Sequence, residues 1–295
     1  MLSLPSELAG LPLVASVSGG KDSTALILAL LEAGLVTRYV FADTGWEAPE
    51  TYTYLDTLRT KLGIVIDVVG VPGGMLAIAT KKAGFPQRKG RWCTEKLKMI
   101  PIREYHRAIG ADVVNVVGVR AEESAKRAAM SELEDDAEWG GWVWRPLLRW
   151  SVAEVLAIHH RHGVPVNPLY KRGHNRVGCY PCINADKEEI RLVAEHSPER
   201  IDEIRAHELA QSTERARRNT SGEGNFKHLT STYFSARESL GPRGIDEVVE
   251  WSRTDHGGKQ LPLLASVPSG GCMRWGLCEP PTTEGEGEDD AAQGN

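Results

Sequence analysis

Several features that would place a chain in a membrane or in the secretory pathway are missing from this sequence of 295 residues. No apolar run approaches the roughly 20 residues that a helix needs to cross a bilayer. The first residues, MLSLP, lack the basic region and the long apolar region of a secretory signal peptide. We therefore expect a cytoplasmic protein without a membrane partner.

An excess of positive charge and a large number of cysteines are also missing. Lys and Arg number 35 against 40 Asp and Glu, and the formal net charge of −5 argues against a wholly basic, nucleic-acid-binding surface. Only five cysteines are present. In a reducing compartment, cysteines indicate metal or catalytic chemistry rather than disulfides. The chain has no internal repeat, and its ordinary apolar content suits one large domain or two modest ones.

The most informative stretch is VASVSGGKDST, residues 14–24, where a short apolar run stops at two glycines and a helical pattern follows. Strand, glycine turn and helix N-terminus, in that order, point free backbone N–H groups at a phosphate. Lys21 can add a charge, and Asp22 can cap the helix or help to hold a magnesium ion. A Walker A loop is excluded because Ala15 and Asp22 stand where that pattern requires Gly and Ser or Thr. The expected phosphate-binding residues are Ser18, Gly19, Gly20, Lys21, Asp22, Ser23 and Thr24.

Alternating strand-like and helical patterns predict the fold. Strands are predicted at 13–17, 38–41, 65–69 and 113–117, with a last one within 142–150. Between consecutive members of the first four strands, helices are predicted at 24–32, 47–62 and 96–109. This order is typical of an α/β fold with a doubly wound parallel sheet. Ligands bind such a sheet at the carboxyl ends of its strands.

Polar residues follow the second predicted strand, in the sequence DTGWE that begins at Asp43. A carboxylate that leaves a strand end beside a phosphate loop can bind magnesium or orient a ribose hydroxyl. We expect Asp43, Thr44 and Gly45 to contact the nucleotide or its metal ion. The alternative is that Asp43 only caps the helix that follows.

The fourth predicted strand ends in GVRAEES, which begins at Gly118. Arg120 is well placed there to donate two hydrogen bonds to phosphoryl or sulfuryl oxygens, and Gly118 should lie beside the nucleotide. The alternative is a surface ion pair of Arg120 with Glu122 or Glu123.

Residues 81–93 are basic and interrupted by glycines, which favours a mobile lid over anions. Lys96 and Lys98 extend the positive charge, and Lys96 should bind the nucleotide. The alternative is a solvated basic face.

The rest of the chain predicts a helical C-terminal part. Ser151 with Glu154 forms a capping-box pattern that opens a helix reaching to His162, whose histidines we interpret as ordinary helix residues. Residues 131–138 are acidic and predict an exposed excursion, while 187–218 and 226–251 predict helices. We expect a nucleotide-binding domain at 1–150, a cysteine-containing helical region at 151–279, and an acidic disordered tail at 280–295.

Cys179 and Cys182 form a CxxC pair in a turn that also carries glycine and proline. Two thiolates cannot complete a four-ligand site, so Cys93 and one of the C-terminal cysteines would have to join them. The three interpretations are a 4Fe–4S cluster, a structural zinc on the same ligands, and a redox dithiol. Spacing alone does not separate them.

Taken in order, the segments SGGKDST, DTGWE, RWCTEKLK, GVRAEES, RPLLRW, NPLY and GCYPC resemble the phosphoadenosine phosphosulfate reductase superfamily over residues 13–186. The resemblance implies the PP-loop fold of the adenine-nucleotide α-hydrolases, with an adenine nucleotide as ligand. RWC together with CxxC resembles the iron–sulfur members, in which an adjacent pair of cysteines joins the CxxC. Thr94 follows Cys93 here, so one ligand must come from elsewhere. We predict a 4Fe–4S cluster on Cys93, Cys179, Cys182 and Cys278, with Cys272 as a free reactive thiol.

Lys21 and Asp22 separate two functions within this superfamily. Assimilatory reductases lack this Lys-Asp pair. The pair itself suits a substrate that loses pyrophosphate. The chain therefore resembles the iron–sulfur ATP pyrophosphatase component of DNA phosphorothioation systems. We expect ATP and Mg²⁺ as ligands and cleavage of ATP to AMP and pyrophosphate, which activates a substrate for sulfur transfer. The expected catalytic residues are Lys21, Asp22, Arg120 and Cys272.

Two alternatives remain: a reductase that releases sulfite from a sulfonucleotide, and a nucleotide-binding metal module without turnover. The sequence leaves the sulfur acceptor open between a nucleic acid and a small molecule. A sulfur or electron donor protein is a further expected partner.

Overall fold

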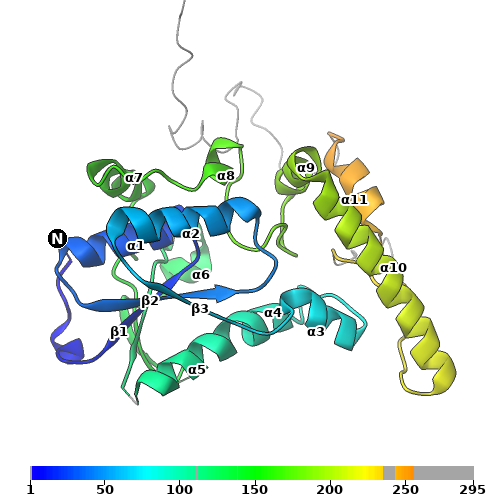
Figure 1. The fold of residues 1–295 in the computed structure, drawn as a ribbon, viewed down its shortest axis with the longest axis horizontal. Helices are drawn as coiled ribbons and strands as arrows, with labels where there is room; N and C mark the ends of the chain where they lie inside the picture. Colours follow the sequence, from blue (N-terminus) through cyan, green and yellow to red (C-terminus); the bar gives the residue numbers. More distant parts are fainter. Residues whose placement is uncertain (1, 111, 138, 235–242, 256–295) are drawn as a thin grey trace, which may run out of the picture.

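The computed structural model describes residues 2–110, 112–137, 139–234 and 243–255, and a six-stranded sheet lies at its centre (Figure 1). The strand order is β3-β2-β1-β4-β6-β5, in which only β5 runs antiparallel to its neighbour. The predicted doubly wound, mainly parallel α/β fold is therefore confirmed. The strands are β1 (Leu13–Val17), β2 (Thr37–Asp43), β3 (Ile66–Gly70), β4 (Val114–Val117), β5 (Leu133–Asp136) and β6 (Gly141–Trp144).

Helices cover both faces of the sheet. On one face, α1 (Lys21–Glu32), α2 (Pro49–Leu62) and α7 (Val152–Arg161) enclose the largest apolar core, while α5 (Ile100–Ile109) covers the other face (Figure 1). Residues 25–30 of α1 are fully or almost fully buried because this helix lies between the sheet and α7. The capping box predicted at Ser151 is present and begins α7.

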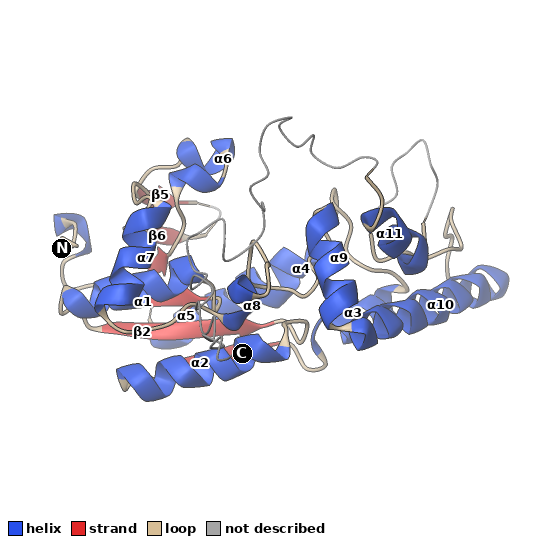
Figure 2. Ribbon diagram, turned by 90° about the horizontal axis from the view of Figure 1, so that it is seen from above, coloured by secondary structure: helices blue, strands red, loops and turns tan. Residues whose placement is uncertain are grey.

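A second apolar core lies beyond the end of the sheet, around α3 (Gly74–Lys82), α9 (Lys187–His196), α10 (Pro198–Ser221) and α11 (Ile245–Ser252) (Figure 2). Trp46, which follows β2, is fully buried in this core, so the end of the sheet is joined to it directly. The proposed division of the chain at residue 150 stays a prediction. The short elements are η1 (Ser6–Leu8), α4 (Trp92–Thr94), the π-helical η2 (Glu95–Met99), η3 (Ala121–Glu123), α6 (Ala125–Ala128) and α8 (Pro168–Lys171).

Four predictions of secondary structure need correction. Of the helices predicted over 226–251, the described residues form only α11, and residues 226–234 are not helical. The acidic excursion at 131–138 contains β5, an antiparallel strand that pairs with β6. The last parallel strand ends at Trp144 rather than near 150, because the chain turns at 146–149. The helix predicted over 187–218 is two helices that meet at Ser197, because Pro198 disfavours a helical residue before it. No helix in the described ranges is long and apolar enough to cross a membrane.

Candidate functional site

The glycine loop between β1 and α1 has the geometry expected of a phosphate loop. Gly19 adopts a positive φ of 73°, and a Cβ there would lie 2.9 Å from the Thr51 side chain, so a larger residue would be both strained and crowded. The Ser23 hydroxyl accepts hydrogen bonds from the Ser18 N–H and hydroxyl, both at 3.2 Å, and donates to the Gly20 carbonyl at 3.0 Å. These bonds close the turn and begin α1 immediately after it.

Three side chains from the segment 159–170 hold this loop from behind. The Asn167 amide donates to the Gly19 carbonyl at 3.2 Å, and the Lys21 N–H donates to the Tyr170 hydroxyl at 3.2 Å. His159 Nε2 lies 2.8 Å from the Lys21 carbonyl oxygen, and the side chain is buried. The interpretation of His159 as an ordinary helix residue was therefore incomplete. Its place on the same helical face as the apolar Val155 was the only signal of burial in the sequence.

Lys21, Asp22 and Arg120 form a buried ion-pair chain at the start of α1. The Lys21 amine lies 2.9 Å from one Asp22 carboxylate oxygen, and Arg120 Nε lies 2.5 Å from the other. Burial acts to raise the pKa of Asp22, but Lys21 and Arg120 outweigh it and hold that pKa below its usual value. The Asp22 carboxylate is therefore ionised at neutral pH.

Arg120 contacts carboxylates. The alternative interpretation of the sequence, an ion pair of Arg120 with Glu122 or Glu123, is therefore correct in part. Besides Asp22, its guanidinium donates to Glu122 at 2.5 Å; the Arg120 side chain is 2% exposed and that of Glu122 is 53% exposed, so only the Glu122 end of this pair reaches the surface. Gly118 allows β4 to approach α1, because a Cβ there would lie 2.9 Å from the Asp22 carbonyl oxygen. Contact of Arg120 or Gly118 with a nucleotide stays a prediction.

The end of β2 is organised by Glu47, a residue that the sequence analysis did not single out. The buried Glu47 carboxylate accepts hydrogen bonds from the Thr44 hydroxyl at 2.7 Å and from the Thr44 N–H at 3.2 Å. Asp43 Oδ1 accepts from the Gly45 N–H and the Tyr52 hydroxyl, each at 2.8 Å. Within the described residues, no group donates a hydrogen bond to the second carboxylate oxygen of Asp43. Both oxygens of Asp22, in contrast, are paired.

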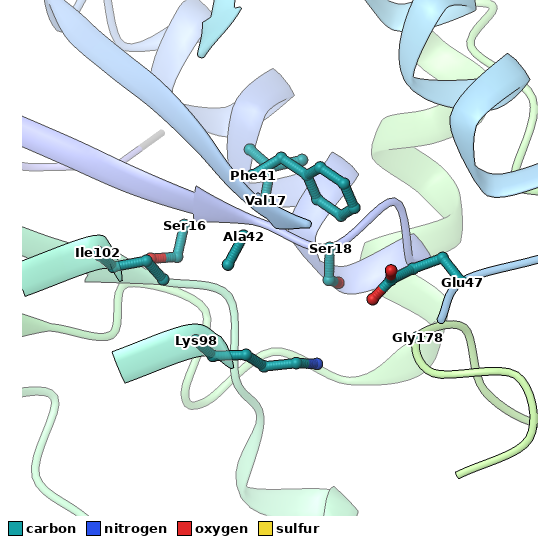
Figure 3. Close-up of a pocket in the computed structure, with 9 residues that line it drawn as sticks. All are labelled: Ser16, Val17, Ser18, Phe41, Ala42, Glu47, Lys98, Ile102 and Gly178. Carbon is teal, nitrogen blue, oxygen red and sulfur yellow. The ribbon is translucent and has the colours of Figure 1, made fainter. Parts of the chain in front are cut away.

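A cavity of about 140 Å³ opens at the carboxyl ends of β1 and β2, and its lining is mainly apolar with a few polar groups (Figure 3). Lys98 extends toward it from η2, and Glu47 points into it from the loop after β2. Of the two lysines that the sequence analysis named here, Lys98 lines the cavity, while contact of Lys96 with a nucleotide stays a prediction. The lining residues are Ser16, Val17, Ser18, Phe41, Ala42, Glu47, Lys98, Ile102 and Gly178.

The CxxC turn lies beside this cavity. Cys179 pairs through its backbone with Glu47, and its sulfur lies 3.8 Å from the Thr44 hydroxyl. Burial raises the pKa of the Cys179 thiol, although the nearby Lys98 amine opposes this effect. Cys179 in turn is the main cause that raises the pKa of Lys98. Lys98 is thus a cation beside the CxxC.

Cys93, Cys179 and Cys182 are free thiols that all pack against the second core. Within the residues that the structure describes, no group of three or more His, Cys, Asp or Glu side chains is placed to hold a metal ion. The three thiols do not make a finished ligand set in this arrangement. Cys272 and Cys278 lie outside the described residues, as does the predicted tail at 280–295.

The predicted lid at 81–93 is partly packed into the protein. Phe85 is buried against Tyr233, with ring centroids 4.9 Å apart, and Arg215 donates to the Ala83 carbonyl at 2.5 Å. Only residues 88–91 form an exposed run beyond these contacts. A mobile lid over the whole segment is therefore wrong for its first half.

Comparisons with known proteins show which proteins this chain is similar to. The family model described as the phosphoadenosine phosphosulfate reductase domain matches residues 12–185, which include the glycine loop, the cavity lining and the three described cysteines. An uncharacterized 37.8 kDa protein of Escherichia phage 186 is 32% identical over 86% of this chain and 92% of its own length. The adenosine 5'-phosphosulfate reductase of Allochromatium vinosum is 29% identical over 59% of this chain and 68% of its own. The crystal structure of the phosphoadenylyl-sulfate reductase of Candida auris covers 60% of this chain and 85% of its own, with 19% identity and a TM-score of 0.49.

Proposed function

Because the chain belongs to the phosphoadenosine phosphosulfate reductase domain family, we propose that it is an adenine-nucleotide enzyme that cleaves ATP to AMP and pyrophosphate. A substrate oxygen attacks the α-phosphorus, the bond from that phosphorus to the bridging oxygen breaks, and pyrophosphate leaves. A sulfur nucleophile then displaces AMP from the activated substrate. The observation that carries the proposal is the Lys21 amine beside the ionised Asp22 at the N-terminus of α1.

The residues around the glycine loop have distinct parts in this reaction. The loop N–H groups and the Ser18 and Ser23 hydroxyls bind the phosphates, with the N-terminus of α1 directed at them. Lys21 neutralises charge that develops on the leaving pyrophosphate. Arg120, which is buried and paired with Asp22, holds that carboxylate in place, and we assign Thr24 and Gly45 to nucleotide binding.

Asp43 is the residue that we assign to magnesium. It stands at the carboxyl end of β2, next to the cavity, with one oxygen held by Gly45 and Tyr52. A bound magnesium ion would supply positive charge to the phosphoryl oxygens. Lys98, which lines the cavity, adds positive charge to this site, and Lys96 lies two residues before it in η2.

The cysteines support a role in sulfur chemistry. Cys179 adjoins Gly178, which lines the cavity, so a thiol stands close to the proposed nucleotide site. We retain as part of the proposal a 4Fe–4S cluster on Cys93, Cys179, Cys182 and Cys278, with Cys272 as the sulfur-carrying thiol. The sulfur acceptor is either a nucleic acid or a small molecule, and a sulfur or electron donor protein is a further proposed partner.

A sulfonucleotide reductase is the second candidate function. It is favoured by the similarity to adenosine 5'-phosphosulfate reductases over the part of the chain that carries the loop and the CxxC. In this reaction a cysteine thiolate attacks the sulfur of the sulfonucleotide, AMP or its 3'-phosphate leaves, and a thiol donor then releases sulfite from the resulting thiosulfonate.

Parallel assays of the anaerobically purified protein separate the two functions. Radiolabelled ATP, adenylylsulfate and its 3'-phosphate should be incubated with Mg²⁺, a thiol donor and candidate acceptors. We expect pyrophosphate and AMP from ATP in the presence of the correct acceptor. Sulfite from a sulfonucleotide, with no pyrophosphate from ATP, would establish the reductase instead. Tight ATP binding with neither product would indicate a module without turnover.

A further inference from the structure

We propose that His159 is a positioning residue that sets the orientation of the phosphate loop by holding the Lys21 carbonyl through its Nε2–H. The side chain is 3% exposed on α7, the helix that packs against α1. Its Nε2 lies 2.8 Å from the Lys21 carbonyl oxygen. The inference rests on the proposed function only in requiring that the loop binds phosphate groups.

The backbone of Lys21 is held at both ends. Its N–H donates to the Tyr170 hydroxyl at 3.2 Å, while its carbonyl faces His159. Lys21 is the first residue of α1, and the first turn of a helix carries N–H groups without partners inside the helix. Fixing the Lys21 peptide groups therefore fixes the direction of the neighbouring N–H groups that would bind phosphate.

The second ring nitrogen of His159 anchors the imidazole at its other side. Nδ1 lies 3.0 Å from the Val164 carbonyl oxygen, and the Val164 N–H donates to the His159 carbonyl at 3.0 Å. Both ring nitrogens thus face carbonyl oxygens. A neutral imidazole has one N–H to donate, and an imidazolium has two. A hydrogen bond donated by Nε2 reaches the loop, whereas one donated by Nδ1 would only close the turn after α7.

Amide side chains distinguish these two bonds. In Gln the amide nitrogen lies near the position of Nε2, and in Asn it lies near the position of Nδ1. His159→Gln therefore keeps a donor for Lys21, His159→Asn keeps a donor for Val164 alone, and His159→Leu keeps neither. If His159 served only for packing, the Gln and Asn variants would behave alike, or the variant whose side chain differs less in shape from histidine would perform better.

The experiment measures the dissociation constants of inorganic pyrophosphate, ATP and adenylylsulfate by calorimetry with Mg²⁺, together with kcat and KM. His160→Gln, at the exposed neighbouring position, is the matched control. We expect His159→Gln and the control to stay within about twofold of the parent. His159→Asn and His159→Leu should weaken pyrophosphate binding or lower kcat/KM by about 10- to 100-fold, the range that small misplacements of binding groups produce.

Urea unfolding of each variant separates positioning from stability. The proposal is overturned if the losses of affinity or kcat/KM parallel the losses of unfolding free energy rather than the position of the amide donor. It is also overturned if His159→Asn binds or turns over better than His159→Gln. A parent that binds pyrophosphate but releases none from ATP refutes the ATP reaction, while the series of binding constants still tests His159. An unchanged series with intact ATP turnover refutes His159 alone. A parent that binds none of the three ligands refutes both.

Discussion

Replacing Gly118 by alanine tests the close approach of β4 to the start of α1. The added Cβ would lie 2.9 Å from the Asp22 carbonyl oxygen and 3.2 Å from the Ser23 Cα. Both atoms belong to the backbone of α1, so no flexible side chain can move aside to make room. Overpacking of this kind costs about 1–3 kcal/mol.

The expected result has two parts. The free energy of unfolding in urea should fall by about 1–3 kcal/mol, with an unchanged dependence on urea concentration. Nucleotide affinity should also fall in the fraction that remains folded, because the Asp22 backbone must shift to relieve the contact. Circular dichroism and calorimetric titration with ATP measure the two effects on the same samples.

Gly110 supplies the matched control, since it lies on the other side of β4 and a Cβ there meets no atom within 4 Å. Its φ of 165° is extended, so alanine can adopt it without strain. Gly110→Ala should change the unfolding free energy by less than about 0.5 kcal/mol. Equal behaviour of the two alanine variants would refute the steric argument, and lost stability with parental ATP affinity would refute the link to Asp22.

Three further predictions concern charge, pH and metal. Lys21→Ala should lower the turnover of ATP about 10²- to 10³-fold, a larger effect than its effect on the unfolding free energy, because it removes a contact to the leaving group. Lys81→Ala, at an exposed position of α3, is the control, and parental turnover by the Lys21 variant would refute the assigned role. Burial lowers the pKa of His106 to about 4, so the unfolded chain binds a proton more readily, and stability should decline as the pH falls from about 6.5 to about 4, by roughly 3 kcal/mol at most. Urea midpoints at several pH values should show this decline in the parent and a smaller one in His106→Leu; identical profiles would contradict it. Protein purified anaerobically should contain iron and sulfide. The Cys272→Ser variant should keep them, whereas Ser variants of Cys93, Cys179, Cys182 and Cys278 should lose them. Zinc without iron in the parent would exclude the cluster.

Features set by residues that are close in sequence could be predicted without the structure. The SGGKDS loop, the alternation of strands and helices, and the capping box at Ser151 depend on backbone preferences and spacings within a few residues. The parallel sheet followed from that alternation, because parallel strands need crossover helices. These local patterns placed the nucleotide site at the carboxyl edge of the sheet, and the cavity there is consistent with this.

The contacts that give the site its arrangement join residues far apart in sequence, and only the tertiary structure decided them. Asp22 and Arg120 are 98 positions apart, and His159 and Lys21 are 138 apart. Lys98 rather than Lys96 reaches the cavity because the π-helical turn sets the direction in which each side chain points. Sequence spacing predicts which residues share one helix or strand. Which partner a polar side chain meets depends on how separate elements pack, because packing decides which hydrogen-bond donors and acceptors are withdrawn from water together.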